Sequence, residues 1–226
     1  MKVGGGAAEE ALARRQGIPI FPLPNGVLFP RAPLGLHVFE PRYRRMTEDV
    51  LASDSLMAVA LLKPGWERDY YGTPPVHPVA CAGVVEEHRR LPDGRFNIRL
   101  RGLRRIEILG FLGEAAYRVA AFRCLDDREA SASPGRDDER ERLLWRCVRL
   151  AQQVGGGYAS LSGLPAERPF EAGVNRLCQG LSIEADQRQR LLEIDDVLER
   201  CRVLHGLLAE CWKESAARGD APEPVH

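Results

Sequence analysis

Three aromatic residues stand close together in a stretch rich in glycine, proline and charged residues. Trp66, Tyr70 and Tyr71 fall within residues 63–78, which show neither helical nor strand periodicity. Aromatic rings on such a loop offer rigid contact area at low cost in conformational entropy, which suits the binding of a peptide. The alternative is that the rings fold back over the end of the neighbouring β-structure. Both interpretations stay open, and these three residues are the candidate peptide-binding site.

A second group of functional candidates consists of closely spaced arginines. Its members are Arg99, Arg101, Arg104 and Arg105. A basic patch of this kind could bind the phosphate backbone of RNA. Against this, Glu86, Glu87 and Glu107 interleave with the arginines, and only Phe96 could stack on a base. A solvated strand face with ion pairs is therefore the main interpretation, and RNA binding is the alternative.

The sequence offers few residues suited to metal binding. His77 and Cys81 are of the right types, but four residues of extended strand span about 13 Å, so the two cannot share an ion without a bend. His37 and Glu40 are better explained as a turn in which the histidine is paired. We therefore expect no metal site and no cofactor.

Catalytic features of nucleotide hydrolysis and proteolysis are also missing. None of the three lysines, Lys2, Lys63 and Lys213, follows a glycine, so the sequence has no G-x-x-x-x-G-K-[ST] phosphate-binding loop. A Ser–Lys dyad needs a lysine in a buried site, whereas these lie in a tail, a Pro-Gly loop and a helix end. The sequence thus predicts no catalytic residues and a protein that is not an enzyme.

The composition indicates a globular protein without a strong net field. Basic and acidic residues number 32 each among 226, and 44% of residues are hydrophobic. A zero net charge gives no bulk attraction to nucleic acid or membrane. The six cysteines form no C-x-x-C pair, and no apolar run is long enough to span a membrane. We therefore expect free thiols, a cytoplasmic location and no membrane partner.

The first half of the sequence predicts short strands and a single early helix. Prolines punctuate residues 18–40 and exclude a helix until Pro41, which suits the first helical position. We expect residues 18–45 to be framework that contacts no ligand. The predicted strands are residues 56–62, 79–86, 96–101, 104–109 and 117–125, with Gly102 breaking the run between the third and the fourth. This irregular spacing favours a compact mixed barrel over a βαβ sheet.

Beyond a charged boundary at residues 126–138 the apolar period changes from two to 3.6. The predicted helices are residues 138–154, a second over 170–181, a third capped by Ser182, and a fourth capped by Asp195 or Asp196 and reaching Trp212. The expected organisation is a disordered tail (1–17), a β-barrel subdomain (18–126), a linker (127–137), a helical bundle (138–215) and a frayed tail (216–226).

Several short motifs occur in the order and spacing of a known domain. They are residues 19–23, 28–30, 33–34, 37–43 (HVFEPRY), 76–83, 93–98 and 100–105, followed by the weaker 191–193 with Asp196 and Arg200. Together they resemble the N-terminal, substrate-binding domain of Lon proteases over residues 18–212. The resemblance implies an α+β fold: a PUA-like mixed β pseudo-barrel with one early helix, followed by a C-terminal helical bundle.

The resemblance also sets the functional expectation. In the full-length protease this domain precedes an ATPase and a peptidase module, and this sequence resembles a free-standing form without them. We expect a non-catalytic module that binds unfolded or apolar polypeptide segments. Its role would be that of an adaptor or regulator of proteolysis, with a protease as a further partner. An RNA-binding PUA-like domain that uses the arginine-rich corner is the alternative, and nucleic acid is not the expected partner.

Overall fold

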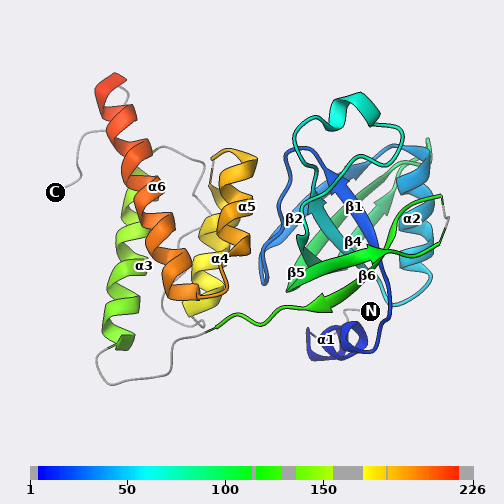
Figure 1. Ribbon diagram of the computed structural model, residues 1–226, viewed down its shortest axis with the longest axis horizontal. Helices are drawn as coiled ribbons and strands as arrows, with labels where there is room; N and C mark the ends of the chain where they lie inside the picture. Colours follow the sequence, from blue (N-terminus) through cyan, green and yellow to red (C-terminus); the bar gives the residue numbers. More distant parts are fainter. Residues whose placement is uncertain (1–4, 114–115, 129–135, 155–169, 182, 219–226) are drawn as a thin grey trace. The chain divides into compact units, whose positions relative to one another are not determined.

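The computed structural model describes residues 5–113, 116–128, 136–154, 170–181 and 183–218 (Figure 1). The chain divides into two compact units, residues 1–126 and 127–226. Each unit is described by itself below. The first unit contains the sheet, and the described residues of the second form four helices. None of the helices in the described ranges is long and apolar enough to cross a membrane.

The first unit is built on a closed mixed sheet. Its strands are β1 (Ile18–Leu23), β2 (Pro33–Val38), β3 (Leu56–Leu61), β4 (Val79–Arg90), β5 (Phe96–Phe111) and β6 (Val119–Cys124). The strand order is β2-β5-β4-β3-β1-β6, and β6 also pairs with β5, so that five strands close into a ring. Strand β2 adds to the first half of β5, while β6 pairs with its second half. Only the β1–β3 pair in this ring is parallel. The predicted mixed β pseudo-barrel is confirmed.

Strand β3 shows why the barrel has two apolar faces. All six of its residues are buried, because successive side chains point to opposite sides of the sheet and both sides are covered. Leu56 and Ala58 join an apolar cluster that includes residues of the first helix, α1 (Gly5–Ala13). Met57 and Val59 join a second cluster that includes residues of α2 (Pro41–Leu51).

Helix α1 corrects the expectation of a disordered tail over residues 1–17, of which residues 1–4 lie outside the described residues. Ala8 and Leu12 are each 1% exposed and pack into the barrel cluster. They stand four residues apart and therefore on one face of the helix. Arg15, just after the helix, pairs with Asp54 at 2.7 Å. One apolar pair in a glycine-rich segment of mixed charge is too short a pattern to predict a docked helix. The first unit thus has α1 and α2 rather than a single early helix.

Strand β5 corrects a second expectation, because Gly102 does not interrupt it. The strand continues through the glycine for 16 residues. The N–H of Gly102 donates to the Ala32 carbonyl (2.9 Å), and a Cβ at this position would overlap the Phe29 carbonyl oxygen. The glycine is therefore needed because another segment of backbone crosses the strand there, and not to end the strand.

The second unit contains the predicted helical region. Its helices are α3 (Arg136–Gln153), α4 (Phe170–Gly180), α5 (Ala185–Glu193) and α6 (Val197–Arg218). Asp196 caps α6 through a hydrogen bond from the Glu199 N–H (3.0 Å), as one of the two predicted caps. For α5 the predicted cap Ser182 lies outside the described residues, and Glu184 forms a capping box with Gln187 instead. Helix α6 continues through residues 216–218, so these residues do not belong to the frayed tail expected at 216–226.

One buried ion pair ties the start of the second unit to its last helix. Arg200 is fully buried and binds both carboxylate oxygens of Asp127, at 2.7 and 3.4 Å. The same guanidinium donates to Asn175 Oδ1 (2.5 Å) and to the Ile194 carbonyl (2.6 Å). Asp127, which we expected to lie in a linker, is therefore part of the packed helical unit. Residues 129–135 of that predicted linker lie outside the described residues.

Candidate peptide-binding pocket

The aromatic loop of the first unit divides into an inner pair and an outer ring. A 3-10 helix, η1 (Trp66–Asp69), begins after Gly65, whose φ of +87° suits glycine. The ring of Trp66 lies 5.4 Å from that of Tyr70, and Tyr70 lies 5.1 Å edge-on from Tyr71. Trp66 and Tyr70 are partly buried, whereas Tyr71 is 88% exposed. Each of the two interpretations of this loop thus describes part of it.

The start of α2 anchors this loop. The Tyr70 hydroxyl donates to Glu40 Oε1 (2.5 Å), and this hydrogen bond, with burial and the negative charge of Glu40, raises the pKa of Tyr70 to about 12. Arg42 pairs with Glu40 (3.2 Å) and donates to the carbonyl of Tyr70 (2.9 Å) and, at 3.4 Å each, to those of Tyr71 and Gly72. Glu40 can do this because Pro41 keeps it extended, at φ −68° and ψ 137°, before the helix begins.

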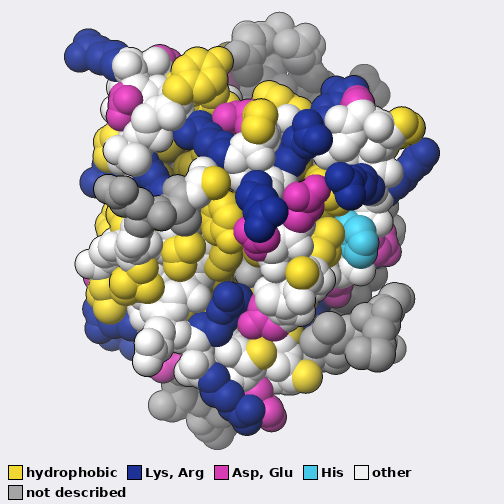
Figure 2. Space-filling view, turned by 90° about the vertical axis from the view of Figure 1, so that its right-hand side faces the viewer, with side chains coloured by type: hydrophobic (Ala, Val, Ile, Leu, Met, Phe, Trp, Pro, Cys, Tyr) yellow, Lys and Arg dark blue, Asp and Glu magenta, His cyan; other side chains and the backbone are white. Residues whose placement is uncertain are grey.

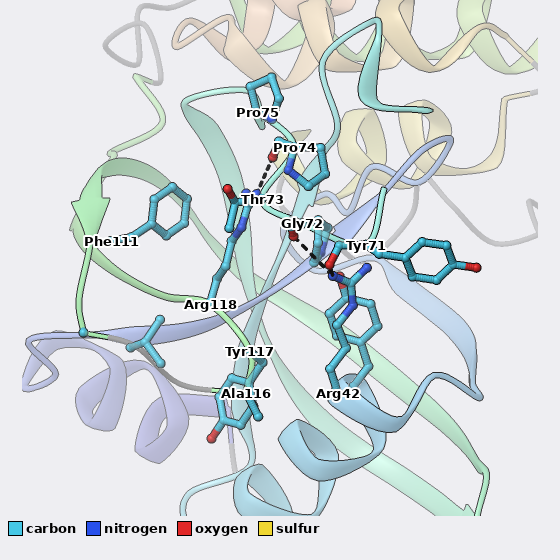
Figure 3. Close-up of a pocket in the computed structure, with 14 residues that line it drawn as sticks. Arg42, Tyr71, Gly72, Thr73, Pro74, Pro75, Phe111, Ala116, Tyr117 and Arg118 are labelled. Atoms are coloured by element: carbon cyan, nitrogen blue, oxygen red, sulfur yellow. Dashed lines mark hydrogen bonds between the residues drawn. The ribbon is translucent and has the colours of Figure 1, made fainter. Parts of the chain in front are cut away.

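A pocket of about 580 Å³ lies between this loop, the start of α2, and the region where β5 ends and β6 begins. Its wall includes Pro22, Arg42, Tyr43, Tyr71, Phe111 and Arg118. Figure 3 shows Phe111 and Arg118 on one side and Arg42 and Tyr71 on the other, with the Tyr71 ring extending outward from the loop. Residues 18–45, expected to be framework alone, therefore also supply part of the pocket wall.

The inner wall of the pocket is aromatic and rigid. Tyr43 is buried, and its ring lies 4.7 Å from that of Phe21. The Arg42 guanidinium covers the Tyr43 ring at 4.7 Å. Burial is the main cause that raises the pKa of Tyr43. Tyr117, from the opposite wall, donates to Asp49 Oδ2 on α2 (3.0 Å). These contacts fix the rings before any ligand arrives, which lowers the entropy cost of binding.

The outer rim of the pocket is apolar and open to solvent. Of the residues that line it, Phe111 is 48% exposed and Tyr71 is 88% exposed, and Leu109 and Leu112, close to Phe111 in the sequence, are exposed too. Figure 2 is viewed from the right-hand side of Figure 1 and shows hydrophobic side chains interspersed with basic and acidic ones on the face that it presents. Exposed large apolar residues that adjoin a pocket are typical of a binding surface. The rim therefore extends the contact area beyond the pocket itself.

Only one of the three predicted peptide-binding residues lines the pocket. Tyr71 lines the pocket, whereas Trp66 and Tyr70 are not among its lining residues and pack against each other within the loop. Phe111 and Arg118 were not among the predicted site residues, because Phe111 lies beyond the predicted strand 104–109 and Arg118 was predicted only as part of the strand 117–125. An apolar pair followed by glycine, at residues 111–113, was the signal for an exposed turn between two strands.

The arginine-rich corner is engaged in interactions within the protein. Its ion pairs are Arg99–Glu87 (2.5 Å), Arg101–Glu86 (2.6 Å) and Arg104–Asp126. Arg105 is 1% exposed and donates to the carbonyl of Asp126 (3.1 Å). A phosphate backbone would have to displace these carboxylates, so the geometry favours the solvated, ion-paired face over RNA binding.

The remaining candidates are the residues considered for metal binding and the cysteines. Within the described ranges, no group of three or more His, Cys, Asp or Glu side chains could hold a metal ion. His37 Nδ1 lies 2.7 Å from Asn97 Oδ1 across the β2–β5 pair. The six cysteines form no disulfide bond in the described structure. In the second unit, the sulfur atoms of Cys147 and Cys201 lie 3.8 Å apart.

The mixed barrel followed by a helical region is the fold of the domain found at the N-terminus of Lon proteases. Residues 17–210 match the family described as the ATP-dependent protease La (LON) substrate-binding domain. The chain belongs to this family, as the sequence motifs indicated.

Two relatives with the name Lon protease are much longer than this chain. The chain is 23% identical over 190 residues to the Lon protease of Desulfosudis oleivorans, covering 82% of this chain and 23% of that protein. It is 28% identical over 206 residues to Lon protease 1 of Herpetosiphon aurantiacus, covering 81% and 24%. The chain therefore spans about a quarter of the length of these relatives.

Two solved structures share the fold. A crystal structure of a Lon N-terminal domain protein from Xanthomonas campestris matches with a TM-score of 0.57 and 25% identity. The N-terminal domain of a Mycobacterium avium complex Lon protease matches with a TM-score of 0.60 and 17% identity. Each match covers 86% of this chain and 98% of the other.

Proposed function

We propose that this chain is a non-catalytic module that binds unfolded or apolar polypeptide segments in the pocket between Tyr71 and Phe111. The observation that carries the proposal is the pocket itself, with a rigid aromatic inner wall and an exposed apolar rim. Fixed aromatic anchors surrounded by open contact area are what binding of an extended segment requires. Membership of a substrate-binding domain family supports the same class of ligand.

The proposed role is to present bound segments to a protease, as an adaptor or regulator. Two facts support it. The matched family is described as the substrate-binding domain of an ATP-dependent protease. The sequence itself carries no G-x-x-x-x-G-K-[ST] loop, so hydrolysis of ATP by a P-loop is not available within these residues.

Binding can be measured by fluorescence anisotropy with dephosphorylated β-casein carrying an uncharged dye. We expect a dissociation constant on the order of micromolar for the wild type. The double variant Tyr71→Ala/Phe111→Ala should weaken binding by about tenfold or more, because it removes an aromatic group from each side of the pocket.

The matched control is Trp145→Ala/Trp212→Ala in the second unit. These rings are 45% and 38% exposed, close to the 48% of Phe111, but they lie on α3 and α6. The control should bind casein like the wild type. Equal loss in both double variants would show non-specific adhesion to exposed aromatic rings, and the proposed pocket would be rejected.

The proteolytic role is tested separately. Degradation of the same casein by a Lon protease and ATP is followed with and without this chain. The wild type should change the rate, and Tyr71→Ala/Phe111→Ala should abolish that change. An unaltered rate with the wild type would rule out the adaptor role, even if casein still binds.

A further inference from the structure

The guanidinium of Arg118 has an unusual position in the pocket. Arg118 precedes β6 and is partly buried. One Nη donates to the carbonyl oxygen of Pro74 (2.5 Å), and the guanidinium lies 5.0 Å from the centre of the Phe111 ring (Figure 3). The group is thus held at the pocket wall by one carbonyl and one aromatic face.

The charge of Arg118 is not balanced as that of its neighbour is. Arg42, on the other side of the pocket, pairs with Glu40 at 3.2 Å. No carboxylate among the described residues lies within ion-pair distance of Arg118. Burial lowers the pKa of Arg118, and the positive charge of Arg42 lowers it further, against opposing effects of Tyr43 and Asp69. The folded protein therefore bears a desolvation cost for this cation that an incoming anion would offset.

The remaining donors of Arg118 suit a carboxylate. A guanidinium has five N–H donors in a planar fork, and the Pro74 carbonyl accepts from one nitrogen. Carboxylates bind such a fork through two parallel hydrogen bonds. Tyr43, Phe111 and Pro22 line the pocket with apolar or aromatic surface, and Arg118 is partly buried, so a charge–charge interaction there is stronger than in bulk water.

We propose that the pocket recognises a carboxylate carried by an otherwise apolar polypeptide segment, with Arg118 as its binding partner. This inference rests on the proposed function and adds the chemical class of the bound segment. The carboxylate comes either from the end of a chain or from an aspartate or glutamate side chain. Both present the same planar anion, and the experiment distinguishes them.

The test compares short peptides of one apolar sequence, each carrying an uncharged dye at its amino end. One ends in a free carboxylate and a second in a carboxamide. A third and a fourth end in a carboxamide and carry a central glutamate or a central glutamine. We expect one of the two anionic peptides to bind the wild type about tenfold more tightly than its neutral counterpart, as a hydrogen-bonded ion pair would give. Which one does so identifies the source, and the preference should shrink as salt is added.

Variants assign the preference to Arg118. Arg118→Gln should abolish the preference, so that each anionic peptide binds no more tightly than its neutral counterpart, and Arg118→Lys should retain part of it because the charge stays but the fork is lost. Arg123→Gln is the matched control, since Arg123 lies on β6 but pairs with Glu107 on an exposed face. A preference that persists in Arg118→Gln would overturn the inference.

The outcomes separate this inference from the proposed function. If the wild type binds all four peptides equally and Tyr71→Ala/Phe111→Ala loses them all, the pocket binds peptides but does not read a carboxylate. If casein binds and none of the peptides does, the inference fails while the proposed function stands. If neither casein nor any peptide binds, both are wrong.

Discussion

At the scale of single residues, Glu40 connects the framework of the first unit to its candidate site. Its carboxylate accepts the Tyr70 hydroxyl and pairs with Arg42, which in turn holds three carbonyls of the loop. A single acidic side chain before Pro41 thereby fixes the position of the loop that carries Tyr71. This arrangement predicts a pH dependence.

The prediction concerns the ionisation of Tyr70, whose pKa is raised from 10.0 to about 12 chiefly by its hydrogen bond to Glu40. Because the folded state favours the neutral phenol, this bond stabilises the protein fully below about pH 10, and its contribution is lost as the pH rises through about 12. Glu40→Gln should move the Tyr70 transition toward its ordinary pKa. Spectrophotometric titration of tyrosinate, with Tyr70→Phe to assign the transition, measures it.

The control for this titration is Glu48→Gln, on the helix α2 that follows Glu40. Glu48 pairs with Arg90 at 3.2 Å in an exposed position and does not contact Tyr70. The Glu48→Gln variant should therefore leave the tyrosine titration unchanged. Superimposable curves for Glu40→Gln and the wild type would contradict the coupling between Glu40 and Tyr70.

At the scale of elements, two sets of contacts stabilise segments that the sequence predicts to be a tail and a linker. Helix α1 covers one apolar cluster of the barrel through Ala8 and Leu12. In the second unit, Arg200 of α6 holds Asp127 at the beginning of the unit and Asn175 of α4. Each set of contacts leads to a stability prediction.

For α1, Leu12→Ala should destabilise the protein by about 2–5 kcal/mol, because it removes a fully buried side chain and leaves a cavity. Glu9→Ala, at an exposed position of the same helix, should change stability by less than about 0.5 kcal/mol. Urea unfolding followed by circular dichroism gives both values. If Leu12→Ala left the free energy of unfolding unchanged, α1 would behave as the disordered tail that the sequence predicts.

For α6, Arg200→Met should destabilise the helical unit by about 3–5 kcal/mol, since it leaves the Asp127 carboxylate without its buried partner. The matched change Arg202→Met breaks exposed pairs with Glu139 and Glu199, both at 3.5 Å, and should cost about 1 kcal/mol or less. The measurement is urea unfolding monitored by helical circular dichroism. Similar losses in both variants would argue against a special role of the buried pair.

At the scale of the whole molecule, the candidate site belongs to one unit. Every residue that lines the pocket lies within residues 1–126, as do both apolar clusters described above. The strand ring also closes within this unit, because β6 pairs with both β1 and β5. The helical unit is therefore not needed to form the pocket wall.

This division predicts that a fragment of residues 1–126 folds by itself and binds casein within about threefold of the intact chain, a difference below about 1 kcal/mol. The fragment should unfold cooperatively in urea and lose casein binding on Tyr71→Ala/Phe111→Ala. A folded fragment without binding would show that the second unit contributes to recognition.

The sequence by itself determined the family, the mixed barrel and the helical character of the second half. These follow from local rules: prolines exclude helix before Pro41, six successive apolar residues form the doubly buried β3, and a change of period marks the helices. The aromatic loop was also visible in the sequence, although only Tyr71 of its three residues lines the pocket.

Only the tertiary structure decided which residues form the site and which segments are packed. Most of the residues Tyr71, Arg42, Phe111 and Arg118 are far apart in the chain, and they meet because β5 ends and β6 begins beside the loop that α2 anchors. Ala8 and Leu12 become core residues because a barrel cluster lies beneath them. Local propensity carries no information on such contacts, since they depend on how the sheet closes and on which backbone segments cross it.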